Sequence, residues 1–243
     1  MPDLIEHLSD YSLVRLLDIG CGDGAVTRRF VEKLPTITRL VGVDRDPVAL
    51  DEARDCLQGL EPDVDCTVLQ ANAETLPFPD ACFDAVLCCD LLHHLADVPA
   101  ALGEARRVLR PGGVLVVMEI VADVQSSAEE TGRDMHHLKA WVDRVMGIPH
   151  GESFSAHTVL QSLADAGFVI GWQERWPSEP LDPAHPADAE YIAGERSYLE
   201  DYLSFAEDSP DYPAIRRAAA RIFHRMESRG FARQPQLVLI GRK

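Results

Sequence analysis

Three closely spaced glycines, Gly20, Gly22 and Gly24, follow a short apolar segment at residues 13–19. Glycines permit a tight turn and let a ligand approach the backbone more closely than a Cβ atom would allow. Residues 25–34 then follow a helical pattern, and the N–H groups at the start of a helix favour anionic or polar ligand groups. A strand, a glycine turn and a helix in this order are typical of the first unit of a nucleotide-binding fold.

Two acidic residues suggest which nucleotide this turn could bind. Asp44 ends the next strand-like segment, twenty residues after Gly24, where a carboxylate can accept hydrogen bonds from a ribose. Asp18 precedes the first glycine, where its charge would repel a pyrophosphate but suit an ammonium and a sulfonium group. The third glycine also comes one residue earlier than in a dinucleotide fingerprint, and Ala25 occupies the expected position. These features favour S-adenosylmethionine over NAD.

Apolar strands and amphipathic helices alternate through the first half of the chain. We expect strands at residues 39–43, 66–69, 83–89 and 114–120, and helices at 47–57 and 98–109. Continuous apolar strands that alternate with helices indicate a parallel sheet that is covered on both faces. Pro111, Gly112 and Gly113 separate the last of these helices from the strand that follows it.

The alternation changes after residue 121. We expect helices at residues 128–145, 155–166, 188–205 and 214–229, and strands at 168–176 and 236–241. A proline-rich bend begins at Pro177. The sequence therefore predicts one domain over residues 1–243, with helical cap insertions near 121–151 and 177–235.

Composition limits the partners of the protein. The chain has 40 Asp and Glu residues against 23 Lys and Arg, a formal net charge of −17. Nucleic-acid binders need a basic face, so we expect no nucleic acid and no membrane surface as a partner. The densest basic groups fit solvated helix faces; they are Arg106, Arg107 and Arg110, and Arg216, Arg217 and Arg221.

Cysteine usage and hydropathy bear on localisation. The six cysteines include no Cys-x-x-Cys pair, which favours reduced thiols in the cytosol. The first residues are mixed and acidic, unlike a signal or transit peptide, and no apolar run approaches the roughly 20 residues of a membrane span. We expect a soluble, cytoplasmic protein.

The glycine segment at residues 17–24 (LDIGCGDG) resembles the signature of class I S-adenosylmethionine-dependent methyltransferases of the small-molecule type. Further similar segments follow in order at 42–44 (GVD), 72–78 (NAETLPF), 83–86 (FDAV), 92–95 (LHHL) and 104–113 (EARRVLRPGG). Together they cover residues 16–119, about two fifths of the chain. The resemblance implies an α/β fold, a doubly wound, mostly parallel sheet of seven strands whose last strand is antiparallel.

The resemblance also implies which residues bind S-adenosylmethionine. Asp18 would support the amino group of the methionine portion, and the glycine turn would line that portion. Asp44 would bind the ribose hydroxyls, and Asn72 would meet the adenine edge, where family members often have Asp. The implied cofactor-binding residues are Asp18, Gly20, Cys21, Gly22, Asp44, Arg45, Asn72, Ala73, Cys89 and Asp90.

The implied activity is transfer of a methyl group to a small-molecule acceptor through an O, N or C nucleophile, with S-adenosylhomocysteine as product. The acceptor is not identified by the sequence, and neither is the oligomeric state, with a homodimer left open. The alternatives are a non-catalytic protein or partner subunit that binds an adenosyl ligand, and an NAD-dependent oxidoreductase. Methyl transfer needs a general base only when the acceptor arrives protonated.

His94 is the candidate catalytic residue, and bracing of its own loop is the alternative role. His136 and His137 are adjacent, so they diverge by about 100° on a helix and cannot easily share a metal. With His150 and His157, they are interpreted as acceptor-site bases or surface residues; no metal ligand is predicted, and a metal centre near this segment is the less favoured alternative. The cap residues that could line an apolar acceptor pocket are Met135, Trp141, Met146, Tyr191, Tyr198, Tyr202 and Phe205.

Overall fold

The computed structural model describes residues 2–60 and 63–243, which divide into two compact units. The sheet unit comprises Met1–Glu119, His157–Glu174 and Leu237–Lys243, and the helical unit comprises Ile120–Ala156 and Arg175–Gln236. None of the described helices combines the length and the apolar character that a membrane span requires.

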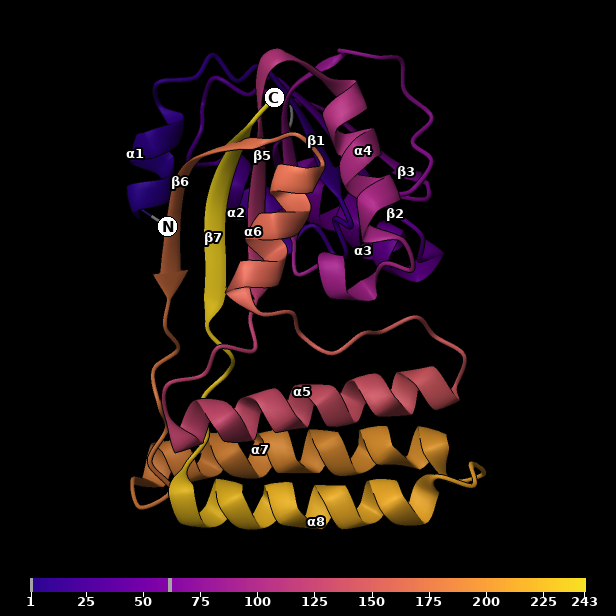
Figure 1. Cartoon of the computed structure of the whole chain (residues 1–243), viewed down its shortest axis with the longest axis vertical. Helices are drawn as coiled ribbons and strands as arrows, with labels where there is room; N and C mark the ends of the chain where they lie inside the picture. Colours follow the sequence, from indigo (N-terminus) through magenta and orange to yellow (C-terminus); the bar gives the residue numbers. More distant parts are fainter. Residues whose placement is uncertain (1, 61–62) are drawn as a thin grey trace. The chain divides into compact units, whose positions relative to one another are not determined.

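The sheet unit is built on a seven-stranded sheet with the order β3-β2-β1-β4-β5-β7-β6 (Figure 1). β1 pairs in parallel with β2 and β4, β2 with β3, and β4 with β5. The last strand runs antiparallel to its neighbours, which confirms the predicted doubly wound α/β fold. The strands are β1 (Arg15–Ile19), β2 (Arg39–Asp44), β3 (Asp65–Gln70), β4 (Phe83–Cys89), β5 (Leu109–Ile120), β6 (Val169–Trp176) and β7 (Gln236–Arg242).

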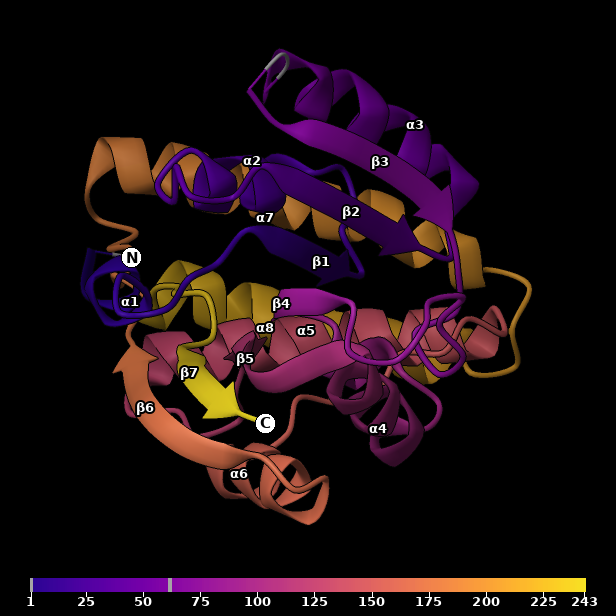
Figure 2. The same cartoon turned by 90° about the horizontal axis from the view of Figure 1, so that it is seen from above.

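Helices cover both faces of this sheet. Figure 2 shows α1 and α2 on one face and α4 and α6 on the other. Two of the helices begin with a capping aspartate. The side chain of Asp46 accepts a hydrogen bond from the N–H of Val48, and that of Asp97 accepts one from the N–H of Ala100, both at 2.9 Å. The helices are α1 (Pro2–Leu8), α2 (Ala25–Val31), α3 (Pro47–Leu57), α4 (Val98–Val108) and α6 (Ala156–Asp165), with short 3₁₀ turns η1 (Gln58–Leu60) and η2 (Leu92–His94).

Two elements differ from the sequence prediction. α1 was not predicted, although Leu4 and Leu8 lie one helical turn apart and both are fully buried. β5 begins at Leu109 rather than at residue 114, because the backbone pairs Phe83 with Leu109 and then shifts register. The Pro-Gly-Gly segment is therefore the irregular start of a strand and not a separate turn.

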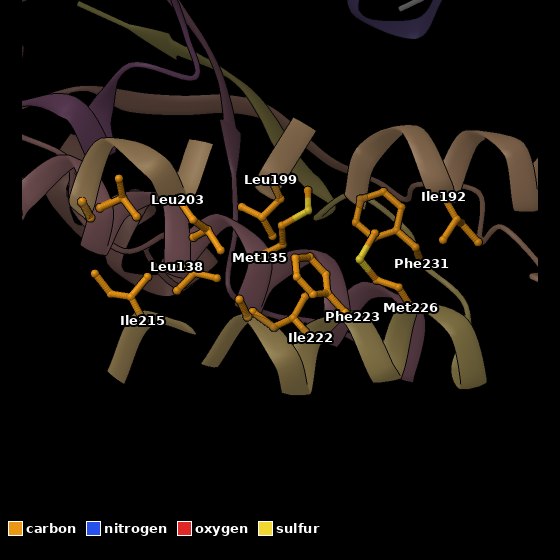
Figure 3. Packing of buried hydrophobic residues seen from close by; sticks show 13 residues of the cluster. Met135, Leu138, Ile192, Leu199, Leu203, Ile215, Ile222, Phe223, Met226 and Phe231 are labelled. Atoms are coloured by element: carbon orange, nitrogen blue, oxygen red, sulfur yellow. The ribbon is translucent and has the colours of Figure 1, made fainter. Parts of the chain in front are cut away.

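The helical unit consists of three long helices that lie side by side in Figures 1 and 2. They are α5 (Ser127–Val145), α7 (Pro186–Leu203) and α8 (Tyr212–Arg229), with the short turn η3 (Ser204–Ala206) after α7. Buried side chains of the three helices and of Phe231 form one apolar cluster (Figure 3). Leu199 on α7 and Met226 on α8 are completely buried in this cluster. The helical unit therefore has a core of its own, while its role as a cap stays a prediction.

Candidate functional site

The glycine turn after β1 has a backbone that only glycine adopts easily. Gly20, Gly22 and Gly24 have φ values of 74°, 52° and 78°, in the left-handed region. A Cβ atom on Gly20 would lie 2.7 Å from Cδ1 of Leu91, whereas one on Gly22 would meet nothing within 4 Å. The N–H of Gly20 donates to the carbonyl oxygen of Val43 at 2.8 Å, which ties the turn to the end of β2. The turn is thus fixed in place and leaves open space at Gly22.

Asp18 lies buried at the end of β1, with an exposed fraction of 2%. Its Oδ2 accepts a hydrogen bond from the hydroxyl of Thr27, while its Oδ1 is buried and has no hydrogen-bond partner among the described residues. Burial raises the pKa of Asp18 to about 7; the Thr27 hydrogen bond opposes this rise, and the charge of Asp44 adds to it. Buried polar atoms without partners are rare, so an ammonium group of a ligand would fit this atom.

Asp44 lies at the end of β2, and its two carboxylate oxygens are held by backbone groups. Oδ2 accepts from the N–H of Gly22 and Oδ1 from the N–H of Asp46, both at 3.0 Å. A carboxylate has about four acceptor positions, so the half-buried Asp44 can still accept from two hydroxyl groups of a ribose. The next residue, Arg45, is exposed.

Asn72 follows β3 and forms a local turn. Its Oδ1 accepts from the N–H of Glu74 at 3.0 Å, and its carbonyl oxygen accepts from the N–H of Thr75 at 3.1 Å. Asn72 is exposed, and the neighbouring Ala73 is buried. The side-chain oxygen is therefore already used once within the turn, which leaves its second lone pair and the amide N–H groups for a ligand.

Cys89 is the last residue of β4, and Asp90 follows it. Asp90 has a φ of 46°, which is uncommon for a residue other than glycine, and its N–H donates to the carbonyl oxygen of Met118 at 2.7 Å. Such a strained backbone tends to occur at functional turns. Burial raises the pKa of the Cys89 thiol, and also that of Cys21, so both are neutral thiols at neutral pH.

A buried glutamate braces the next segment. Oε2 of Glu119, on β5, accepts from the N–H of Leu92 at 2.8 Å, and Oε1 is hydrogen-bonded to Nδ1 of His93. Both Glu119 and His93 are buried, and burial raises the pKa of Glu119 while the His93 hydrogen bond opposes that rise. His94 is less buried, and its ring lies 4.2 Å from that of His93. The side chain that braces this loop through Glu119 is thus that of His93, a role that the sequence did not predict.

The sequence did hold a signal for this brace. Glu119 is the one charged residue in the apolar run 114–120, and such a residue inside a buried strand needs a partner.

The expectation of a solvated helix face was wrong for Arg107. Its guanidinium donates to Glu104 and Asp80 and to the carbonyl oxygen of Phe78 at 2.7 Å, so it fixes the segment before β4 onto α4.

Two histidines of the helical unit, His137 and His150, contact polar side chains of the same unit. Nδ1 of His150 lies 2.6 Å from Oδ2 of Asp143, whose other oxygen accepts from the Tyr202 hydroxyl. Nε2 of His137 lies 2.9 Å from the hydroxyl of Ser153. His157 is separate from them, because it is exposed on α6 of the sheet unit.

The apolar residues expected to line a pocket in the helical unit fall into three groups. Met135 belongs to the buried cluster of Figure 3, and Trp141 and Tyr202 are partly buried against that cluster. The remaining four are exposed; they are Met146, Tyr191, Tyr198 and Phe205. Trp141 also lines a pocket within the helical unit.

Comparison with known proteins bears on the identity of the chain. A family model described as a methyltransferase domain matches residues 17–117. The chain is 38% identical over 195 residues to 27-O-demethylrifamycin SV methyltransferase of Amycolatopsis mediterranei, with 79% of this chain and 67% of that protein covered. It is 42% identical over 107 residues to demethylmenaquinone methyltransferase of Thermus thermophilus, with 43% of this chain and 46% of that protein covered.

Comparison with solved structures shows the same fold. The YcgJ protein of Bacillus subtilis matches with a TM-score of 0.66 at 21% identity, over 100% of this chain and 97% of that one. The chain spans about half the length of some curated relatives, 46% and 56% in two of them. Fold, ordered motifs and the relative that is matched over two thirds of its length agree: the chain belongs to the class I S-adenosylmethionine-dependent methyltransferases.

Proposed function

We propose that the protein transfers a methyl group from S-adenosylmethionine to a small-molecule acceptor and releases S-adenosylhomocysteine. The observation that carries this proposal is the buried Oδ1 of Asp18, which has no hydrogen-bond partner in the described part of the chain. It lies at the end of β1, directly before the glycine turn. A dinucleotide would bring a pyrophosphate to this turn, where the charge of Asp18 would repel it, so an NAD-dependent reaction is disfavoured.

The residues after the strands of the sheet unit fit the parts of this cofactor. Asp18 would hold the ammonium group, and Asp44 the ribose hydroxyls. The methionine portion would lie along Gly20, Cys21 and Gly22, near Cys89 and Asp90, and the adenine beside Arg45, Asn72 and Ala73. The bound cofactor supplies a methyl group on a sulfonium, which is open to direct attack.

The protein's own contribution is to hold the acceptor in line with the methyl group and to exclude water. Such positioning can supply roughly 7–11 kcal/mol of a reaction barrier. We assign His94 as the residue that would accept a proton from an acceptor that arrives protonated. The neighbouring His93–Glu119 pair supports this role, because it fixes the short helix that carries His94.

We propose that the helical unit recognises the acceptor, as a cap formed by the two insertions. In this proposal the motif residues of the sheet unit bind the cofactor. The helical unit has polar clusters and a pocket of its own. The Amycolatopsis relative is named for a substrate with a free oxygen at position 27, so hydroxyl compounds are the first acceptor class to screen, before N and C nucleophiles. Six free cysteines favour a reducing, cytoplasmic location.

Calorimetric titration of the protein with S-adenosylmethionine, S-adenosylhomocysteine and NAD tests the cofactor. We expect micromolar binding of the two adenosyl ligands alone and a loss of about 100-fold in Asp44→Ala, which removes two charge-assisted hydrogen bonds. Asp55→Ala is the matched control, because Asp55 is exposed on α3. Binding of NAD, or of none of the three, would overturn the proposal. Binding without methyl transfer to any acceptor screened would favour the non-catalytic alternative.

A further inference from the structure

A pocket of about 270 Å³ opens between α5 and α8 of the helical unit. Its apolar lining is formed by Leu138, Trp141 and Ile222, of which Leu138 and Ile222 are buried. Its basic lining is formed by Arg144, Arg221 and Arg225. Arg221 and Arg225 also line an adjoining, more open hollow on α8. We call the first of these the α5–α8 pocket.

The positive charge of this pocket is unusual for so acidic a chain. Arginines recur every fourth residue along α8, at positions 217, 221, 225 and 229, so they follow one face of the helix. Elsewhere in the molecule most arginines are paired with acids, but Arg221 has no ion-pair partner among the described residues. An exposed cation that stabilises no other group is available to a ligand.

Arg225 offers a second donor that the protein does not use. Its Nη2 lies 2.6 Å from Oδ2 of Asp134, but its Nε is buried and has no hydrogen-bond partner in the described structure. A buried guanidinium N–H without an acceptor is costly, and a small movement of the Arg225 side chain would let an anionic oxygen in the pocket satisfy it. This observation is independent of the exposed Arg221, and it points to the same kind of ligand.

Two acids and one histidine also line the pocket. Burial opposes ionisation of Asp134, but hydrogen bonds from Arg225 and Arg133 lower its pKa overall, so it is ionised and fully engaged. Glu152 lies 3.8 Å from Nδ1 of His137, and burial lowers the pKa of that histidine. Three arginines against two carboxylates leave the pocket with one net positive charge at neutral pH.

The volume and the apolar lining of the pocket limit the size and shape of the ligand. The volume lies near the lower limit for small-molecule pockets, which suits a single ring. Nε1 of Trp141 donates to Oδ2 of Asp211 at 3.0 Å, which fixes the orientation of the indole. An indole held in this way offers a flat surface on which an aromatic ring can stack.

We propose that the helical unit binds a small aromatic anion in the α5–α8 pocket, with its carboxylate or phosphate oxygens on Arg221 and Arg225 and its ring beside Trp141. All of these residues belong to the helical unit, so the inference does not depend on the proposed cofactor site. The carboxylate and the phosphate ester share the same chemistry toward arginine, which pairs with either through two parallel hydrogen bonds.

Trp141 fluorescence in a Trp172→Phe/Trp176→Phe background gives a direct test, because the chain has three tryptophans. The probes are benzoate, phenyl phosphate, neutral benzamide and inorganic phosphate, each added without an adenosyl ligand. We expect saturable changes with benzoate or phenyl phosphate at about millimolar concentration, and weaker binding at high salt. The stronger of the two anions identifies the preferred head group. Benzamide and inorganic phosphate should bind at least about tenfold more weakly.

Arg221→Gln should weaken the binding of the anion about tenfold, since it removes charge-assisted hydrogen bonds. Arg217→Gln is the matched control: it makes the same change one turn earlier on α8, at an exposed residue outside the pocket. Thermal unfolding of both variants checks that they remain folded. The inference is overturned by equal binding of benzamide, by equal effects of the two substitutions, or by the lack of a saturable change with either anion.

Discussion

The two units of the molecule place their polar groups in different ways. At the glycine turn of the sheet unit the connection is short in sequence: the N–H of Gly22 reaches Asp44 across 22 residues, from one strand end to the next. At the arginines of α8 in the helical unit it is long: Arg225 reaches Asp134 across 91 residues, because two distant helices must first pack together. A site made by consecutive turns leaves a pattern in the sequence, whereas a site made by helix packing does not.

The physical basis of each site differs as well. The sheet unit depends on backbone conformations that glycine permits and on acids at strand ends. The helical unit depends on an apolar cluster that holds its arginines and histidines in place. A substitution in the apolar cluster of the helical unit, or one in the glycine turn of the sheet unit, therefore shows whether the two sites are independent.

The largest effect is expected in the core of the helical unit. Leu199→Ala removes a completely buried side chain of the cluster in Figure 3 and should lower the free energy of unfolding by about 2–5 kcal/mol. Chemical denaturation measures this change, and Ser197→Ala on the exposed side of α7 is the control, with an effect within about 0.5 kcal/mol. Where the variant remains folded, binding of S-adenosylhomocysteine should be unchanged. A parallel loss of affinity would contradict the independence of the units.

The converse change is Gly20→Ala in the sheet unit. A left-handed φ of 74° costs an alanine about 1–2 kcal/mol, and its Cβ would also press on the side chain of Leu91. We expect S-adenosylhomocysteine affinity to fall by about 100-fold by calorimetry, because the displaced turn lines the proposed cofactor site and holds Asp44 through the N–H of Gly22. Gly103→Ala on α4 is the control, since a Cβ there meets nothing within 4 Å and alanine favours a helix. Equal affinities in both variants would show that the turn does not contact the ligand.

Short-range patterns in the sequence predicted most of the sheet unit. The succession of strands and helices and the glycine turn came from alternating apolar segments and from spacing, and the family resemblance supplied the antiparallel last strand. The roles of Asp18 and Asp44 remain predictions, although the structure places each at the end of its strand. Helix bounds agreed closely where a proline or an acid marks the start, as at Pro47.

The remaining features required contacts that no local pattern contains. α1 has two leucines one turn apart, too few to indicate a helix until the sheet that buries them is known. The role of Arg107 depends on carbonyl oxygens about thirty residues earlier, which a view of α4 alone as an amphipathic helix cannot reveal. For Glu119, the sequence indicates that a charge in a buried strand needs a partner, but it does not identify His93, which lies on another segment.

An intermediate loss of S-adenosylhomocysteine affinity is expected from Asp18→Asn, and the substitution should also change how this affinity depends on pH. The pKa of Asp18 in the unliganded fold is about 7, raised by burial from 3.8, so ionising it costs folding free energy and stability falls as pH rises between these values. An ammonium group favours the ionised form, so ligand binding should release a proton below pH 7. S-adenosylhomocysteine affinity should therefore rise roughly tenfold between about pH 6 and pH 7.5 and then level off.

Calorimetry in two buffers of different ionisation enthalpy measures this proton release. In Asp18→Asn the affinity should be lower and nearly independent of pH, because the amide does not titrate. Thr27 remains in place in this variant as the hydrogen-bond partner of residue 18. A wild-type affinity that does not change with pH would contradict the assignment of Asp18 to the ammonium group.

The smallest effect is expected from Glu119→Gln, which tests whether the brace after β4 requires a charge. A glutamine can still accept from the N–H of Leu92, and its amide can donate to Nδ1 of His93 if that histidine moves its proton to Nε2. Unfolding free energy should therefore change by no more than about 1 kcal/mol, and ligand affinity by a few-fold at most. Nitrogen chemical shifts of the His93 ring report the tautomer, and Glu52→Gln on the surface of α3 is the control. A loss of affinity as large as that of Gly20→Ala would instead make the Glu119 charge part of the cofactor site.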